Sequence, residues 1–476
     1  MRVLSVVLAR VLLLVSLATA CGSGATTKPV QATSPPPAAS PAPQKPVALA
    51  PPASTKATFP GLPDTVAGEH LAWILNAIAN QDGVVTTADV EKRLHAKFLA
   101  AVPADQFVAV SKSLAALDPI VVKSVKGTEL SLVAKLQTKQ GPLLAIVEVD
   151  ESTKQVVGLL FKPDSGDAPR PKTLPEAIQM TEAVAPQAQL LVASLDKGTC
   201  KPMLATKSKQ PLAIGSTTKL YVLLGLVDKI RAGKAKWDDE LAVRDDWKSL
   251  PSGITQNDAA GTKLTLKTFA ERMISISDNT ATDHLLYFVG RKAVEAALRA
   301  TKHTAPARNT PFLSTRELFL FKLGMPDDEI ERYRKLPEAK RRSYLDTTLA
   351  GKQADITKAA DWTTARRIDQ LEWFASADDL CRAMGTLWQR GQQDPAKPLL
   401  DVLGKNSGIE LDKTTWPYIG FKGGSEPGVI NLTWLVRRAD DKWFVVVLTA
   451  NAPAATVDES KVLGIAQGVF ELLAKS

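Results

Sequence analysis

The sequence predicts an α+β protein in which a small N-terminal domain precedes a larger one. Three observations predict this class. Residues 59–165 show helical periodicity and then four β-branched or alternating stretches. From residue 166 onward a strand–turn–strand pattern leads into an apolar helix, and the chain closes with more strands and a helix. The length of 476 residues is enough for two or three packed domains.

Composition excludes several classes of protein. Three cysteines are too few for a disulfide-rich scaffold, and four scattered histidines without a Cys-x-x-Cys pair predict no metal site and no cofactor. The net charge of +9 is spread too thinly to predict a nucleic-acid partner. It suits an anionic small substrate or an anionic cell surface.

Residues 1–20 are predicted to form a secretory signal peptide. Arg2 precedes an apolar run, 11–20, that is too short to span a bilayer. Residues 18–21 (Ala-Thr-Ala-Cys) resemble a bacterial lipobox, which implies lipidation of Cys21 and a membrane-anchored lipoprotein of the cell envelope. The motif has Ala where Leu is common and also suits ordinary signal peptidase, so a secreted or periplasmic protein is the alternative. Residues 21–58, rich in Pro and Ala and without an aromatic residue, are predicted to be a disordered tether.

The predicted N-terminal domain covers residues 59–165. Leu71, Leu75 and Ile78 recur at helical spacing, Thr86-x-x-Asp89 has the pattern of a helix N-cap, and a third helix is predicted around residue 107. Four strands are then predicted, at 120–125, 130–136, 143–149 and 156–161. No catalytic constellation occurs here, which favours a binding or positioning module.

The first candidate nucleophile lies just before an apolar helix predicted at 220–230. Ser-x-x-Lys occurs at Ser194/Lys197 and at Ser216/Lys219, and the spacing alone is weak evidence. Ser194 is on a predicted strand, where residues three apart point to opposite faces. Ser216 is predicted to open the helix, where Lys219 shares its face and can act as its base. An N-cap Ser with a solvated Lys remains the simpler interpretation of this motif alone.

Two later motifs add polar groups. Ser277-Asp-Asn279 offers a hydroxyl that can pass a proton and an amide that can hold a carbonyl, although such clusters also cap helices. Lys422-Gly423-Gly424, on a predicted strand, offers a fixed positive charge and backbone that a substrate can approach closely; the alternative is a glycine bulge with a surface lysine.

Together, in this order, the three motifs resemble the signature of class A β-lactamases and penicillin-binding proteins. The resemblance begins near residue 189 and covers 166–476 as a catalytic domain, with an antiparallel sheet flanked by helices and an all-helical subdomain. It implies that Ser216 is acylated, that Lys219 is its base or base relay, and that Ser277 shuttles the proton to the leaving group. Lys422 is implied to hold Ser277 and a substrate carboxylate.

The same resemblance implies the substrate-binding groups. Asn279 binds the acyl side-chain carbonyl, Gly424 and Ser425 line the substrate, and the backbone amides of Ser216 and Ser425 form the oxyanion hole.

A closer likeness rests on residues 311–318 (PFLSTREL), residues 420–428 (GFKGGSEPG) and the N-terminal α+β domain. These are similar to two-domain β-lactamase-like proteins, typified by a product of the clavulanic-acid biosynthetic cluster, which join a cystatin- or ketosteroid-isomerase-like domain to a class A fold. That family's activity is implied to be a feeble esterase with little β-lactam turnover.

Two departures bear on turnover. Gly423 stands where the usual motif has Thr, so a hydroxyl that grips the β-lactam carboxylate is missing, and Ser425 is the candidate replacement. Glu317 is the one nearby candidate for the deacylating base, but no Glu-x-x-Leu-Asn pattern surrounds it. The apolar periodicity there favours a surface or capping acid. Without a base for water, an acyl-enzyme should persist.

The interval from Ser277 to Lys422 is wider than in class A enzymes. Residues at about 325–366 are rich in charge and predict an inserted helical subdomain over the site. Trp362, Trp373 and Phe374 could line it, although core packing is the commoner use of such aromatics. An oxidising compartment would permit a disulfide between Cys200 and Cys381, but nothing in the sequence shows that they are close.

The leading hypothesis is an exported serine hydrolase that acts through an acyl-enzyme on a small ester or, weakly, on a β-lactam, with membrane contact through Cys21. The rivals are an efficient β-lactamase or DD-peptidase, and an envelope binding protein whose serine site is vestigial. The natural substrate, the oligomeric state and the ligand of the N-terminal domain are not predicted.

Overall fold

The computed structural model describes residues 59–79, 85–139, 141–164, 168–250, 252–352, 362 and 364–476. The predicted signal peptide, the tether and the lipidation site Cys21 lie outside these residues. Among the helices of the described ranges, none is long and apolar enough to cross a membrane.

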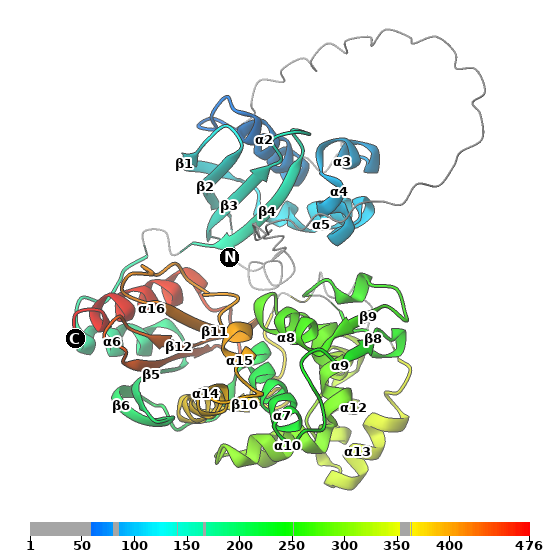
Figure 1. Cartoon of the computed structure of the whole chain (residues 1–476), viewed down its shortest axis with the longest axis vertical. Helices are drawn as coiled ribbons and strands as arrows, with labels where there is room; N and C mark the ends of the chain where they lie inside the picture. The colour runs from blue at the N-terminus through cyan, green and yellow to red at the C-terminus, as the bar shows by residue number, and fades with distance from the viewer. Residues whose placement is uncertain are drawn as a thin grey trace, which may run out of the picture.

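The N-terminal domain consists of helices followed by an antiparallel meander (Figure 1). The helices are α2 (Val66–Ala79), α3 (Thr87–Arg93), α4 (Ala96–Ala101) and α5 (Ala104–Ser113). The strands, in sheet order, are β1 (Val121–Gly127), β2 (Ser131–Thr138), β3 (Gly141–Val149) and β4 (Val156–Pro163). The predicted α+β architecture of this domain is confirmed.

Local sequence explains how these elements form. Thr86 caps α3 and makes the reciprocal capping box with Asp89, which satisfies two free amides at the helix start. In β2, exposed and buried residues alternate strictly, because one face of the sheet packs on the helices and the other faces water. Leu71, Leu75 and Leu132 are among the fully buried residues of the core that results.

The larger domain, predicted to be the catalytic domain, is built on a five-stranded antiparallel sheet in the order β11-β12-β13-β5-β6. Its strands are β5 (Gln187–Asp196), β6 (Thr199–Thr206), β11 (Tyr418–Glu426), β12 (Val429–Arg437) and β13 (Trp443–Asn451). Two short pairs, β7 (Leu212–Ala213) with β10 (Phe374–Ala375) and β8 (Glu240–Ala242) with β9 (Lys263–Thr265), lie outside it. Strands from the two ends of the domain therefore meet, since β13 pairs with β5.

Helices cover both faces of this sheet (Figure 1). On one face, α6 (Leu174–Val184) and α16 (Glu459–Leu473) bury Leu190, Val446 and neighbouring side chains. On the other face, residues that alternate with these, such as Leu191 and Val445, join the helical core. The helices of that core are α7 (Lys219–Arg231), α8 (Leu266–Ser275), α9 (Asn279–Val289), α10 (Arg291–Ala300), α11 (Thr315–Phe319), α12 (Asp327–Lys335), α13 (Glu338–Thr347), α14 (Ala377–Gly391) and α15 (Pro398–Leu403).

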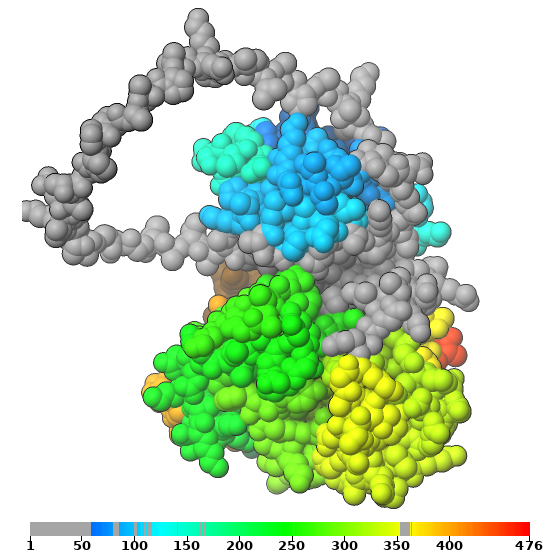
Figure 2. Space-filling model, turned by 90° about the vertical axis from the view of Figure 1, so that its right-hand side faces the viewer, coloured from blue at the N-terminus to red at the C-terminus, as the bar shows by residue number. Residues whose placement is uncertain are grey.

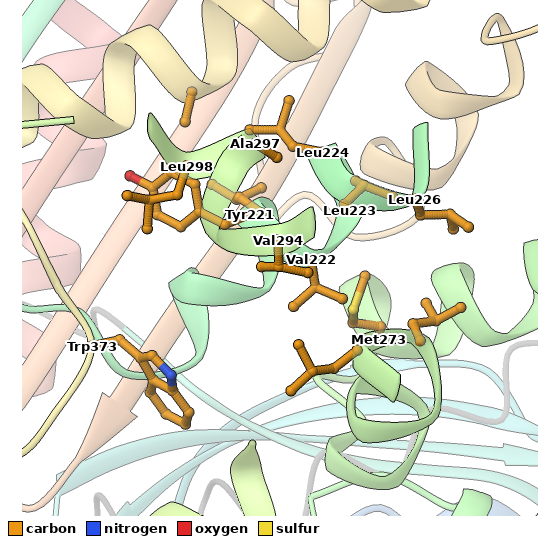
Figure 3. Close-up of a cluster of buried hydrophobic side chains, with 14 of the residues drawn as sticks. Tyr221, Val222, Leu223, Leu224, Leu226, Met273, Val294, Ala297, Leu298 and Trp373 are labelled. Atoms are coloured by element: carbon orange, nitrogen blue, oxygen red, sulfur yellow. The ribbon is translucent and has the colours of Figure 1, made fainter. Parts of the chain in front are cut away.

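Helix α7 lies at the centre of this core. Figure 3 shows its side chains from Tyr221 to Leu226 beside Met273 of α8 and Val294 of α10. Ten of its 13 residues are buried, which is the pattern of a helix enclosed on all sides. Because this rigid helix begins at Lys219, directly after the turn that carries Ser216, it fixes the position of the candidate nucleophile.

Two further predictions are resolved at this level. Cys200 on β6 and Cys381 on α14 are joined by a disulfide, which the sequence left open. Trp373 and Phe374 are buried in core clusters and do not line the cleft at Ser216.

Candidate active site

The nucleophile's segment differs from the sequence prediction. Ser216 does not open α7 but lies in a 3₁₀ turn, Gly215–Thr218, and the α-helix begins one turn later at Lys219. Gly215 has φ +50°, in the left-handed region where a residue without Cβ is at ease. The prediction that Ser216 and Lys219 meet is still met by the geometry, since Lys219 Nζ lies 3.1 Å from Ser216 Oγ.

Lys219 is the hub of the site. Its Nζ donates to Asn279 Oδ1 at 2.7 Å, to Ser277 Oγ at 3.0 Å and to the Ser277 carbonyl at 2.6 Å. The side chain is fully buried. A continuous path therefore leads from the Ser216 hydroxyl through the Lys219 amine to the Ser277 hydroxyl.

Buried hydrogen bonds hold the turn Ser277–Asn279 in a strained backbone conformation. Ser277 has φ +57°, a conformation that costs a residue with a Cβ about 1–3 kcal/mol. Asp278, fully buried, accepts hydrogen bonds from Ile254 N, Thr255 N, Thr255 Oγ1 and Ala281 N. Ser252 Oγ donates to the Ser277 carbonyl at 2.7 Å. Asp278 is therefore the anchor of the motif, and its neighbours on both sides face Lys219.

Lys422 completes the path from β11. Its Nζ donates to Ser277 Oγ at 3.0 Å and to the Gly423 carbonyl at 2.5 Å. Ser277 Oγ thus lies between two lysine amines, one from α7 and one from β11, and can take a proton from one side and pass it to the other.

Gly424 sets how closely β11 approaches the nucleophile. A Cβ on Gly424 would lie 2.1 Å from the Ile214 carbonyl oxygen and 2.6 Å from Ser216 N, so no side chain fits. A Cβ on Gly215 would lie 3.1 Å from Ser425 N. The strand that carries Ser425 therefore packs closely on the turn that carries Ser216, as an oxyanion hole formed by their two amides would need.

Burial sets the charge of both lysines. Removal from water lowers the pKa of Lys219 to about 7, against the opposing charges of Asp278 and Asp283. Burial, aided by the positive charge of Lys219, holds the pKa of Lys422 well below its usual range. A bound anion, such as a substrate carboxylate, would favour the charged form of Lys422.

The catalytic groups open onto a cleft of about 360 Å³. Ser216, Ser277, Lys422, Gly424 and Ser425 line it, together with the apolar side chains Ile276, Phe421, Ile430 and Leu463 and, from the N-terminal domain, Leu160. The inserted helices α12 and α13 were expected to lie over the site. None of their residues lines this cleft, because Ile330, Tyr333 and Leu345 pack into the helical core instead.

Glu317, the candidate deacylation base, is occupied elsewhere. It lies at the start of α11 in a capping box with Ser314, and its carboxylate receives Arg291 at 2.7 and 3.0 Å and the amide of Ser314 at 2.7 Å. It is 4% exposed and does not line the Ser216 cleft. The structure therefore places it as a buried capping acid rather than a surface one, with its oxygens already bonded.

Phe421 fills the space next to Gly423. A Cβ on Gly423 would lie 2.8 Å from the Phe421 ring, which packs against Trp434 at 5.0 Å between ring centroids. A threonine at position 423 would therefore meet the ring of Phe421, which lies two residues earlier on the same face of the strand.

Sequence reasoning missed several groups near the site. Lys322, in a π-helical turn after α11, donates to Glu372 at 2.7 Å and also to Glu426, the residue after Ser425. Asp283 accepts from Thr315 N and Arg316 N and so ties α9 to α11. Glu459 at the start of α16 lines the cleft, and its apolar surroundings raise its pKa to about 7. Their partners are distant in sequence, so no local pattern could have indicated them.

Known protein families match both domains. Residues 173–471 match the β-lactamase enzyme family, and residues 62–154 match the family of the N-terminal domain of the ORF 12 gene product. No curated protein matches the chain.

A comparison with solved structures finds similar chains of low sequence identity. They include β-lactamases from Sphaerobacter thermophilus (19% identity, 63% of this chain and 95% of that chain, TM-score 0.44) and Chitinophaga pinensis (14%, 63% and 98%, 0.44). Another is PBP-A (18%, 66% and 99%, 0.42). The match to the β-lactamase enzyme family spans more than half of the sequence, and the chain therefore belongs to that family.

Proposed function

We propose that the protein is a serine acyl-hydrolase that forms an acyl-enzyme on Ser216, hydrolyses small esters and releases β-lactam acyl groups slowly. The observation that carries the proposal is that the groups needed for acylation are in contact, whereas the candidate base for deacylation is bonded elsewhere. Ser216, Lys219, Ser277 and Lys422 are linked by contacts of 3.0–3.1 Å, whereas the Glu317 carboxylate is bound by Arg291 and by the α11 cap.

In the acylation step, the neutral amine of Lys219 takes the proton of Ser216 as Oγ bonds to the substrate carbonyl carbon. The amides of Ser216 and Ser425 stabilise the oxyanion. When the bond to the leaving group breaks, Ser277 gives that group a proton and is resupplied from Lys219. The alcohol released from an ester leaves the cleft, and water can take its place beside the acyl group. The amine of an opened β-lactam stays attached to the acyl group and blocks that place.

In the deacylation step, Lys219 is the remaining buried base near the acyl carbon. It would have to activate water from the side on which the Ser216 oxygen now lies. We expect slow hydrolysis, because the carboxylate of Glu317 is bound by Arg291 and Ser314. Glu459, the carboxylate that lines the cleft among the described residues, makes no hydrogen bond to Ser216 or Lys219.

The test is time-resolved intact mass of the protein mixed with benzylpenicillin or with a 3′-acetoxy cephalosporin, with Ser216→Ala as control. We expect an adduct that lasts for many minutes and is absent in the variant, together with Ser216-dependent hydrolysis of p-nitrophenyl acetate. Rapid turnover of nitrocefin, or release of D-Ala from a peptidoglycan stem peptide, would favour the β-lactamase or DD-peptidase alternatives. Equal labelling of wild type and Ser216→Ala by a fluorophosphonate would favour the other alternative, an envelope binding protein whose serine site is vestigial.

We also propose export and lipid anchoring through Cys21. The support is the leader sequence together with the Cys200–Cys381 disulfide, a bond typical of oxidising compartments. Metabolic labelling with a radioactive fatty acid should mark the wild type and not Cys21→Ala; a soluble, unlabelled wild type would favour simple secretion.

A further inference from the structure

A second hollow, of about 240 Å³, lies apart from the Ser216 cleft and shares no lining residue with it. It is bounded by α12, α13 and the segment 369–374 that leads into β10. Figures 1 and 2 place α12 and α13 at the end of the catalytic domain that is far from the N-terminal domain. Arg308, Arg334 and Arg341 line this hollow from three different elements.

Among the described residues, no carboxylate forms a direct ion pair with Arg308. Its guanidinium donates to the backbone carbonyls of Pro211 at 3.3 Å and Asp369 at 2.6 Å, and packs 3.4 Å from the centroid of the Phe374 ring. Burial lowers its pKa, the charge of Asp369 opposes this, and the nearby charge of Arg334 lowers it further. The charged guanidinium is therefore partly desolvated and lies beside a like charge.

Arg341 has unused hydrogen-bonding capacity. Its Nε is buried and has no partner among the described residues. Arg334 shares the carboxylate of Glu331 with Arg367, which also pairs with Asp327. Glu372, on the wall of the hollow, is already bound by Lys322. Asp369 is the other acid on the wall, so three guanidiniums face two carboxylates among the lining residues, and one of those carboxylates is held by Lys322.

We propose that this hollow binds a small ligand through an oxyanion, a phosphate or a carboxylate, held by Arg308, Arg334 and Arg341. Guanidinium groups match the geometry of both oxyanions with paired, charge-assisted hydrogen bonds. Trp373 and Leu313, also on its wall, would contact an apolar part of the ligand.

The hollow is connected to the nucleophile through β10. The Trp373 carbonyl accepts from Ile214 N at 3.0 Å, and Phe374 pairs with Ala213, immediately before the turn that carries Ser216. A ligand that orders segment 369–374 would thereby also hold the Ser216 turn. Binding itself does not depend on the proposed hydrolase activity.

Isothermal titration calorimetry of the full chain carrying Ser216→Ala tests binding without turnover. Inorganic phosphate and citrate are titrated separately at constant ionic strength, so that the two arms distinguish a phosphate from a carboxylate ligand. We expect saturable binding of at least one of them, weakened tenfold or more by Arg341→Gln. Arg332→Gln is the matched control, because Arg332 is an exposed arginine of α12 that does not line the hollow.

The proposal is overturned if neither anion binds saturably at millimolar concentration, or if Arg341→Gln and Arg332→Gln bind as wild type does. If Arg341→Gln fails to fold, as judged by near-ultraviolet circular dichroism, Arg334→Gln is measured in its place against the same control. Arg341→Lys, which keeps the charge but not the paired donors, should bind with intermediate affinity.

Discussion

Burial of Lys219 lowers the pKa of its amine, which matters for its proposed role as base. With a pKa of about 7, the amine is half deprotonated at neutral pH, whereas an exposed lysine would be almost wholly charged and unable to accept a proton. Only the neutral amine can act as base, so the acylation rate should rise with pH by about tenfold per unit below pH 7 and level off above it. Stopped-flow rates of acylation by nitrocefin between pH 5.5 and 9 measure this.

Lys219→Arg is the control for that profile, because a guanidinium remains protonated over the whole range. Its residual rate should show no such rise. A wild-type rate that is flat across pH 7 would mean that the base is another group.

Asp278 makes a prediction about stability. Four donors meet its buried carboxylate, and Asp278→Ala leaves them without partners, which should lower the free energy of unfolding by about 3–5 kcal/mol. Urea denaturation followed by tryptophan fluorescence gives the value. Asp245→Ala removes an exposed acid paired only with Lys248, and should change stability by less than about 1 kcal/mol. Equal effects of the two variants would contradict the anchoring role of Asp278.

At the scale of elements, the contact of β11 with the Ser216 turn decides activity. Gly424→Ala would drive a methyl group into the backbone at Ile214 and Ser216, so the strand must shift away. Loss of one oxyanion donor alone costs about 10²–10³ in rate, and we expect acylation to fall by at least that factor while circular dichroism is unchanged. Gly324→Ala, where a Cβ meets nothing within 4 Å, is the matched control. Near-normal acylation by Gly424→Ala would refute the close approach.

The same strand explains the departure at residue 423. Gly423→Thr alone collides with the Phe421 ring, whereas Phe421→Ala with Gly423→Thr leaves room for the hydroxyl. We therefore expect the double variant, and not Gly423→Thr alone, to be acylated faster by benzylpenicillin. Stopped-flow acylation rates distinguish the two. A faster single variant would show that Phe421 is not the obstacle.

Elements with local signals were predictable. The Thr86 capping box, the alternation of β2 and the strand under Lys422 are written in neighbouring residues, and the structure confirms them. The start of α7 was predicted one turn early, because a 3₁₀ turn and a helix share the i, i+3 spacing. Lys322 was hidden in an apolar run, since its partners Glu372 and Glu426 are 50 and 104 residues away. Long-range pairs of this kind leave no periodic pattern.

For the whole molecule, the disulfide between Cys200 and Cys381 links parts of the chain that are distant in sequence. Cys200 and Cys381 are 181 residues apart and tie the edge strand β6 to α14. Closing so long a loop restricts the unfolded chain, so the Cys200→Ser, Cys381→Ser double variant should lose about 2–5 kcal/mol of stability. Thermal denaturation with and without reductant measures the loss. A melting temperature that reductant leaves unchanged in wild type would contradict it.

The order of the sheet also fixes when the site can exist during synthesis. Ser216 and Lys219 emerge from the ribosome some 200 residues before β11 supplies Lys422 and the Ser425 amide, and until β13 is made β5 has only β6 to pair with. A chain still being made therefore carries Ser216 and Lys219 without Lys422 and without the Ser425 amide. The proposed reactivity of Ser216 therefore requires strands β11 and β13, and a nascent chain that lacks them should not show it.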